Sequence, residues 1–236
     1  MVLFPINPNW RVLMFKSVLC VSKPKLYRLQ STISLSASCA FLVLLYSLNV
    51  SAANVSVANV SKEWQLDNSR SAFSFVSIKA GNIAETHQFT EMSGSVSGTT
   101  GADIAINTAS VDTLIPIRDE RMQTHLFESL IFPTIRIQAD VDEALLSEVQ
   151  NNGTVQQDVN TTVVIKDRTI NVQAAVLAAM LSDGSVIVTT TKPVLLNAAA
   201  VGLDRGVEKL RELAGLPSIS QAVPVTFSLV FTATEN

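Results

Sequence analysis

The chain has 236 residues, 47% of them hydrophobic and 16% charged, which is enough for one domain of ordinary size with an extension. Five of its 17 basic residues and none of its 20 acidic residues lie in the first 53 positions. Residues 54–236 therefore carry a formal net charge of −8, which excludes a nucleic-acid-binding domain because neutralising phosphates needs clustered Lys or Arg.

The first 53 residues have the layout of a secretory signal. A basic segment is followed by an apolar run from Ile33 to Val50 and then by the small residues Ser51-Ala52-Ala53. This order predicts export, with residues 1–53 as a leader cleaved after Ala53 and residues 54–63 as a loose arm. An uncleaved membrane anchor is the alternative, although the apolar run is short and diluted by serines for a stable span.

From Trp64 onward, apolar and polar residues mostly alternate, which is the period-two pattern of β-strands. Phe73 and Phe75 share one face of the first long strand, and Phe227 and Leu229 share one face of the last. Gly94 interrupts a strand pattern, and we expect a β-bulge there that bends the strand.

Two segments are ambiguous between helix and strand. Thr169 to Leu181 is almost wholly apolar and contains the helix formers Ala, Leu and Met. We predict a strand, because Asp183-Gly184 is a hairpin signal and plain strand sequence follows it. Residues 142–150 fit a helical turn or a continuing strand equally well.

One helix is predicted late in the chain, from Arg205 to Ala214. Asp204 can cap its start, and Gly215 ends it. Its apolar residues form a single stripe, so we expect it to lie against the sheet.

Residues 108–133 break the strand pattern. A charged helical turn from Arg118 to Arg121 precedes two apolar pairs, Leu126-Phe127 and Ile131-Phe132, and Pro133 begins a new strand. A charged turn flanked by aromatic residues between strands predicts a lid over one end of a sheet or barrel.

About eight strands, joined in chain order by hairpin signals, predict an all-β fold: an eight-stranded, up-and-down antiparallel barrel with this short lid segment and one late helix. A two-sheet sandwich is the alternative from the pattern alone. A barrel of eight strands is just wide enough to hold one slim ligand.

Several segments of residues 64–232 resemble the YceI-like family in their order and spacing. The segments are WQLDNSRSAFSF, QFTEMSGSVS, ASVDT, RDERMQTHLFES and FPTIRIQA. The resemblance implies a lipocalin-like barrel spanning residues 64–234, located in the bacterial periplasm, that holds an isoprenoid or a similar long-chain amphiphilic lipid. A bound quinone-like ligand, a homodimer and transient membrane contact are compatible with it.

Apolar residues on the inward strand faces are the candidate ligand contacts. They are Phe73, Phe75, Phe89, Phe127, Phe132, Val163, Val176, Phe227 and Leu229. A filled hydrophobic core explains the same pattern, and the family resemblance favours a lined tunnel over it. An apolar tunnel suits a long hydrocarbon, whose burial contributes about 0.8 kcal/mol per methylene.

Arg118 is the one polar candidate contact. Its guanidinium offers several donors in one plane and could hold the polar head of an amphiphile at the barrel mouth. A local ion pair that orders the lid is the alternative.

The residues that could support catalysis are few, and we predict no enzyme, no metal site and no cofactor. Both cysteines, Cys20 and Cys39, lie in the leader, and there is no phosphate loop or nucleophile elbow. A secreted hydrolase or isomerase using His125 and Asp119 is one alternative to the lipid carrier. A ligand-free structural or partner-binding domain is another.

Overall fold

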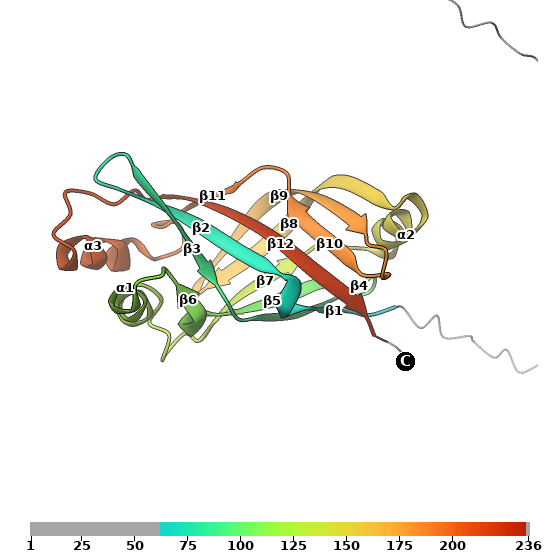
Figure 1. The fold of residues 1–236 in the computed structure, drawn as a ribbon, viewed down its shortest axis with the longest axis horizontal. Coiled ribbons are helices and arrows are strands. Elements are labelled where there is room, and N and C mark those ends of the chain that lie inside the picture. Colours follow the sequence, from blue (N-terminus) through green and yellow to red (C-terminus); the bar gives the residue numbers. More distant parts are fainter. Residues whose placement is uncertain (1–61, 235–236) are drawn as a thin grey trace, which may run out of the picture. The chain divides into compact units, whose positions relative to one another are not determined.

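The strands of residues 62–234, the part of the chain that the computed structural model describes, all pair antiparallel with their neighbours (Figure 1). The strands are β1 (Trp64–Leu66), β2 (Ala72–Lys79), β3 (Ile83–Phe89), β4 (Met92–Ser97), β5 (Gly101–Asn107), β6 (Val111–Asp112), β7 (Thr134–Ala139), β8 (Thr154–Ile165), β9 (Arg168–Met180), β10 (Val186–Thr190), β11 (Val194–Asn197) and β12 (Ala222–Ala233). The helices are α1 (Pro116–Arg121), α2 (Glu143–Asn152) and α3 (Asp204–Leu213), with the short turns η1 (Asn68–Arg70) and η2 (Thr108–Ser110) and the π-helix η3 (Met122–Phe127). The predicted leader and most of the predicted arm lie outside this part.

Eight of the strands form a closed barrel in the order β1-β4-β5-β7-β8-β9-β10-β12. β12 pairs with β1 and closes it, with Trp64 opposite Ala233 and Leu66 opposite Phe231. β2 also pairs with β12, β3 pairs with β2, β6 pairs with β3, and β11 pairs with the start of β12. Barrel neighbours follow the chain order, so the predicted eight-stranded antiparallel barrel is confirmed and the sandwich alternative is wrong.

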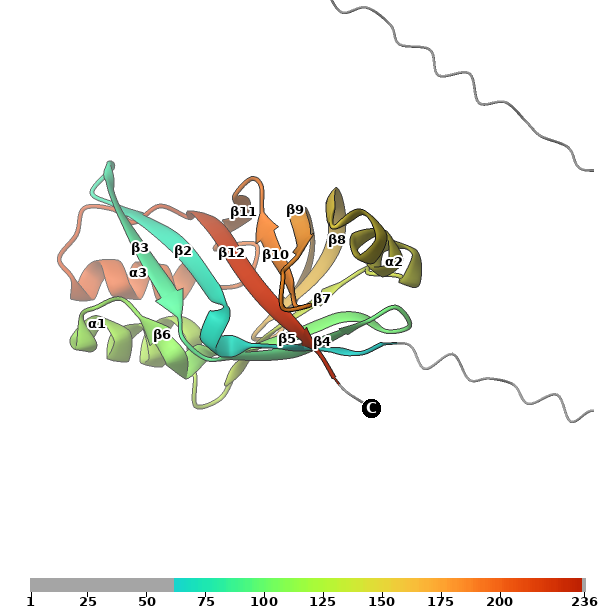
Figure 2. The same cartoon turned by 45° about the vertical axis from the view of Figure 1, so that its right-hand side comes forward.

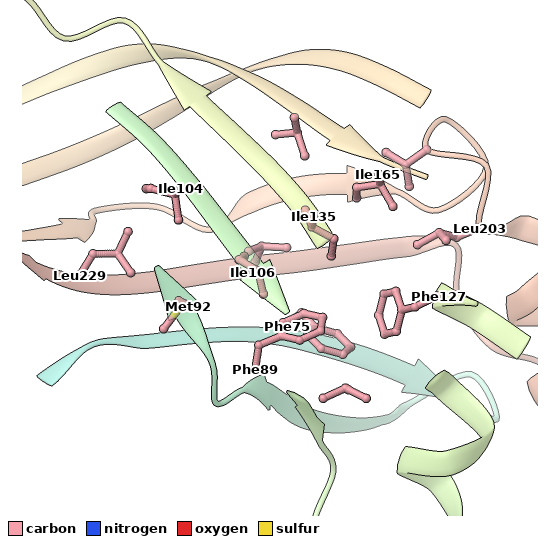
Figure 3. Close-up of a cluster of buried hydrophobic side chains, with 14 of the residues drawn as sticks. Phe75, Phe89, Met92, Ile104, Ile106, Phe127, Ile135, Ile165, Leu203 and Leu229 are labelled. Atoms are coloured by element: carbon pink, nitrogen blue, oxygen red, sulfur yellow. The ribbon is translucent and has the colours of Figure 1, made fainter. Parts of the chain in front are cut away.

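The alternating sequence determines which face of each strand points inward. On β5, Ile104 and Ile106 are buried, and their cross-strand partners on β7 are Ile137 and Ile135. Apolar pairs that face each other across a ladder stabilise the sheet and bury its inner surface. Figure 3 shows such residues from several strands and from the lid converging inside the barrel.

The bulge predicted at Gly94 is wrong. Gly94 pairs in register with Ile104, and a Cβ atom placed on it would lie 2.5 Å from the Asp103 carbonyl oxygen. The glycine is therefore needed for a close approach between β4 and β5. The strand is interrupted slightly earlier, at Thr90 and Glu91, where β3 ends and β4 begins.

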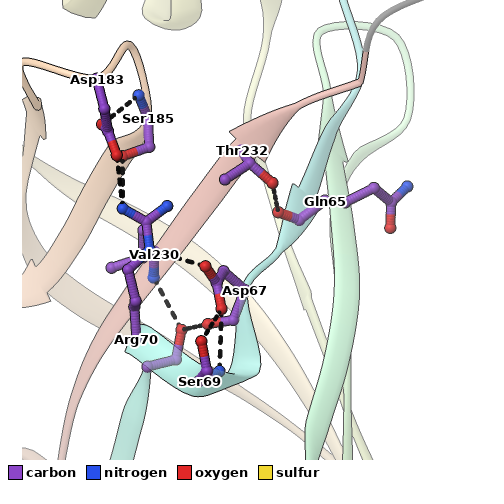
Figure 4. Close-up of polar contacts among 9 residues, drawn as sticks. Gln65, Asp67, Ser69, Arg70, Asp183, Ser185, Val230 and Thr232 are labelled. Carbon is purple, nitrogen blue, oxygen red and sulfur yellow. Dashed lines mark hydrogen bonds and ion pairs between the residues drawn. The ribbon is translucent and has the colours of Figure 1, made fainter.

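The turn between β1 and β2 is held by a group of charges around Arg70 (Figure 4). Arg70 Nε lies 2.7 Å from Asp67 Oδ2, and its Nη1 lies 2.7 Å from Asp183 Oδ2 in the β9–β10 hairpin. Hydrogen bonds from Ser185 and then from Arg70 lower the pKa of Asp183 to about 2. This contact joins segments more than a hundred residues apart, and its one cation faces two carboxylates.

Both ambiguous segments are settled by the structure. The apolar stretch after Arg168 is strand β9, as predicted, and it pairs along its length with β8. Residues 143–152 are helix α2, whose cap residue Asp142 accepts a hydrogen bond from the backbone of Leu145. The late helix is also present as α3, but Asp204 is its first residue rather than its cap, and the cap position Leu203 makes no side-chain bond.

The helices gather at the two ends of the barrel (Figures 1 and 2). α1, η3 and α3 lie together at one end, where residues 108–133 were expected to form a lid, and α2 lies at the other. Within residues 62–234, no helix is long and apolar enough to cross a membrane.

Candidate functional site

A cavity of about 530 Å³ occupies the barrel interior. Its wall includes residues from all eight barrel strands, with Ile117 of α1 and Leu210 of α3 at one end and Leu146 and Val149 of α2 at the other. These helices lie at opposite ends of the barrel (Figure 2). Because residues from both ends line it, the cavity extends along the length of the barrel. The hollow interior that the tunnel interpretation requires is therefore present.

Nine of the ten candidate contact residues line this one cavity. They are Phe73, Phe75, Phe89, Arg118, Phe127, Val163, Val176, Phe227 and Leu229. Phe132 does not line it. It lies in the loop before β7, where its carbonyl oxygen accepts a hydrogen bond from Thr108 Oγ1 and its ring lies 5.9 Å from Lys166 Nζ. The part that the nine residues play in binding stays a prediction.

Aromatic rings form a continuous group along one side of the cavity. Phe227 of β12 stacks on Phe73 of β2, and Phe73 in turn lies 6.2 Å from Phe89 of β3. Phe89 contacts Phe75 at 5.5 Å and Phe127 of the lid at 5.4 Å between ring centroids. These separations are typical of stabilising aromatic pairs, so the lid is packed onto the same apolar wall that a ligand would contact.

The charged part of the wall lies at the lid end, on β2, β3 and α1. Glu85 Oε2 lies 2.9 Å from Lys79 Nζ and 2.8 Å from Arg118 Nη1. Arg118 Nη2 also donates to the Thr113 carbonyl oxygen at 2.6 Å. A hydrogen bond from Lys79, followed by the charge of Arg118, lowers the pKa of Glu85. Arg118 therefore forms an ion pair that ties the lid to β3, which was the alternative to head-group binding, and it also lines the cavity.

His87 is a polar residue of the wall that the sequence analysis did not single out. Only 2% of His87 is exposed, and its Nε2 shares a hydrogen bond of 2.8 Å with Ser77 Oγ. Its Nδ1 has no hydrogen-bond partner in the described part of the chain. Burial, and next the charge of Arg118, lower the pKa of His87. The strand alternation was a usable signal, since it places His87 on the same face as Glu85 and Phe89.

The residues of the hydrolase alternative do not come together. Asp119 accepts hydrogen bonds from the backbone and the hydroxyl of Thr113, and neither Asp119 nor His125 lines the cavity. Among the described residues no hydrogen bond joins His125 to Asp119. No group of three or more His, Cys, Asp or Glu side chains in residues 62–234 could hold a metal ion.

Known proteins share both the sequence pattern and the fold. A family model described as the YceI-like domain matches residues 64–231. A polyisoprenoid binding domain from Saccharophagus degradans, implicated in plant cell wall breakdown, is 32% identical. Its match covers 72% of this chain and 98% of that domain, with a TM-score of 0.68.

A second solved structure shares the fold at lower identity. BcnA from Burkholderia cenocepacia is 17% identical, and its match covers 71% of this chain and 99% of BcnA with a TM-score of 0.54. The comparison with curated proteins found no match.

Proposed function

The chain belongs to the YceI-like family, and on that premise we propose that it binds an isoprenoid or another long-chain amphiphilic lipid inside its barrel without transforming it. The observation that carries the proposal is the cavity of about 530 Å³ along the barrel. A protein interior is normally packed as densely as an organic crystal, so a void of this size is not an accident of loose packing.

The wall of the cavity suits a hydrocarbon chain. Almost all of its residues are apolar, and the charged ones gather at the lid end. Each methylene buried in such a wall contributes about 0.8 kcal/mol, and a long chain can thus be held without directional contacts. The relative of known structure with 32% identity is described as a polyisoprenoid binding domain, which supports the same class of ligand.

The proposal of a carrier rather than an enzyme rests on the position of the possible acid–base groups. His125 and Asp119 lie outside the cavity lining, and His87 is hydrogen-bonded to Ser77 inside it with no carboxylate bond at its other nitrogen. General acid–base catalysis needs such groups within hydrogen-bonding reach of each other and of the substrate.

We also propose that the protein works in the periplasm and exchanges its ligand at a membrane. The leader-like first 53 residues support export. Apolar side chains of the lid support contact with lipid: Leu114 is 84% exposed, and Ile115 and Ile117, which line the cavity, are also exposed. Exposed apolar residues gathered at a cavity opening are typical of interaction sites.

The proposal is tested by mass spectrometry of an organic extract of the protein, purified without detergent or lipid stripping from bacteria that export it. A lipid present in about equal amount to the protein is expected. Ala174→Trp, which points a large ring into the cavity from β9, should remove that lipid while the protein still melts cooperatively.

The adjacent substitution Ala175→Trp is the matched control, because Ala175 lies on the same strand and does not line the cavity. It should retain the lipid. If Ala174→Trp fails to fold, Ala174→Leu serves as a milder substitution. A wild-type extract without lipid, or equal lipid in both variants, would contradict the proposal.

A further inference from the structure

The charged residues that line the cavity carry a surplus of positive charge. Lys79, Arg118 and Arg121 are basic, and among the described residues Glu85 is the only acidic one in the lining. The formal surplus of two positive charges is notable because residues 54–236 as a whole carry −8. A cation-rich site with apolar walls concentrates its field, since the low-dielectric surroundings screen it little.

Two polar atoms in this region are buried and have no hydrogen-bond partner within residues 62–234. Arg118 uses Nη1 for Glu85 and Nη2 for the Thr113 carbonyl, which leaves its buried Nε without an acceptor. His87 Nδ1 is likewise buried and unpaired, while its Nε2 is bonded to Ser77. An unpaired buried donor is costly, and a ligand oxygen that accepts from it removes that cost.

The two atoms belong to one part of the wall. Lys79 and Ser77 of β2 lie on the inward face of the ladder with Glu85 and His87 of β3, and Ser77 is the direct cross-strand partner of Glu85. Arg118 reaches Glu85 from the lid. We name the group Lys79, Glu85, His87, Arg118 and Arg121 the mouth cluster.

The mouth cluster has the opposite composition to the charges around Arg70. There, one guanidinium faces two carboxylates, and its Nε donates to Asp67. In the mouth cluster, one carboxylate is shared by two cations, and Arg118 Nε donates to nothing. The positive charge of Arg70 is therefore neutralised by its own carboxylates. The mouth cluster, in contrast, keeps a surplus positive charge and a free N–H donor that a ligand can use.

On the basis of the proposed function, we infer that the mouth cluster binds a negatively charged head group, a phosphate or a carboxylate, of the lipid in the cavity. Arg118 Nε–H and the protonated Nδ1 of His87 donate to its oxygens, with Ser77 donating to His87 Nε2. Lys79 and Arg121 supply the charge that Glu85 does not neutralise. Oxyanions are the ligands that guanidinium donors recognise best.

The inference is tested with two pairs of probes that share a hydrocarbon chain and differ in head-group charge. One pair is palmitate and 1-hexadecanol, and the other is a polyprenyl monophosphate and its polyprenol. Dissociation constants are measured on the delipidated protein. In at least one pair the anionic member should bind about tenfold more tightly or better, since a hydrogen bond to a charged group contributes roughly that factor.

Arg118→Gln should abolish most of this preference, because the anionic member loses both a donor and a positive charge. Arg136→Gln is the matched control, because Arg136 is exposed on β7, does not line the cavity, and its loss changes the net charge equally. It should retain the preference. If Arg118→Gln perturbs the lid, Lys79→Gln removes a cation from a different element and should weaken the preference as well.

The outcomes separate the inference from the proposed function. Equal affinities within both pairs, or tighter binding of both neutral members, would overturn the inference while leaving lipid binding intact. The inference would also be overturned if Arg118→Gln and Arg136→Gln reduced the preference for the anionic probe equally. Failure of all four probes to bind would overturn the proposed function, and the inference with it.

Discussion

The two ends of the cavity differ in chemistry. At the lid end, the mouth cluster supplies three basic side chains, one carboxylate and a buried histidine. At the α2 end, the wall consists of Val96, Ala102, Leu146 and Val149, with Gln150 and the indole of Trp64 as its polar groups. The lid end therefore carries the charges that an anionic head group needs, whereas the named residues of the α2 end carry no charge.

The difference suggests how specificity is divided along the barrel. Head-group chemistry should depend on the mouth cluster, and the longest chain accepted should depend on the α2 end. Outside the cavity, Arg70 is already paired with Asp67 and with Asp183 of the β9–β10 hairpin. The Asp183 hairpin lies beside α2, since Met180 donates to the carbonyl of Gly153. Four predictions test this division.

The largest effect is expected from filling the α2 end. Ala102→Phe should displace the last carbons of a long chain and leave short chains unaffected. Three displaced methylenes would cost about 2.4 kcal/mol, roughly a fiftyfold loss of affinity. The measurement is the affinity for a series of fatty acids of increasing length, which should fall only above a threshold length.

Ala105→Phe is the control for this series, because Ala105 lies on the same strand and does not line the cavity. A uniform loss at every chain length in Ala102→Phe would mean that the substitution damages the barrel rather than shortening the cavity.

A smaller gain of affinity is expected from removing the carboxylate of the mouth cluster. Glu85→Gln leaves Lys79 and Arg118 without their shared anion, so an anionic probe should bind several-fold more tightly at low salt. The affinity for 1-hexadecanol should not change. Tighter binding of both probes, or of neither, would show that Glu85 does not compete with the head group.

The buried histidine should make stability depend on pH. Because the pKa of His87 is lowered from 6.5 in the folded protein, the unfolded chain takes up its proton first as the pH falls. The free energy of unfolding should therefore decrease below about pH 6.5, by at most about 1.4 kcal/mol per pH unit. Urea unfolding between pH 7 and pH 5 measures this slope.

His87→Phe should flatten that slope, because phenylalanine cannot take up a proton and still packs beside Phe75. The only other histidine in the chain is His125, so His125→Asn is the natural control and should retain the slope. If the slope disappears in His125→Asn, the pH dependence of stability comes from His125 and not from His87.

The smallest effect is expected at the Arg70 contact. The carboxyl of Asp183 should titrate at about 2, and Arg70→Gln should raise its midpoint only part of the way to 3.8, because the Ser185 hydrogen bonds remain. A lowered pKa means that this contact stabilises the fold above about pH 3.8 and is lost as the pH falls toward 2. Carbon-13 NMR of the carboxyl group follows the titration, and chain-length selectivity should not change.

Much of the fold followed from local pattern. The alternation around Ile104, Ile106, Ile135 and Ile137 was enough to predict strands with one buried face, because side chains on a strand alternate with period two. Hairpin signals such as Asp183-Gly184 indicated that strands consecutive in the chain are neighbours in the barrel. Local pattern gave a wrong prediction at Gly94. A glycine is needed there because the backbone of the neighbouring strand β5 lies too close for a side chain, and the sequence around Gly94 does not reveal that contact.

The site was predictable in its apolar part and only partly in its polar part. The inward direction of Phe73, Phe75 and Phe227 follows from the sequence, because large apolar residues that share one strand face are normally buried. Phe132 lies outside the cavity lining, and a loop residue has no periodic pattern from which its direction follows. The role of His87 does not follow from the sequence, because a single histidine on a strand gives no sign of which charges will surround it.

By itself, the sequence determined an all-β domain, its strand order, its inward faces and its family, since each depends on residues close together in the chain or on their spacing. Only the tertiary structure decided that the inward side chains leave a cavity of about 530 Å³, that Lys79, Glu85 and Arg118 meet beside it, and that Arg118 Nε and His87 Nδ1 have no partner there. The physical reason is that packing density and hydrogen-bond satisfaction are sums over neighbours from distant segments, and these neighbours are known only once the barrel has closed.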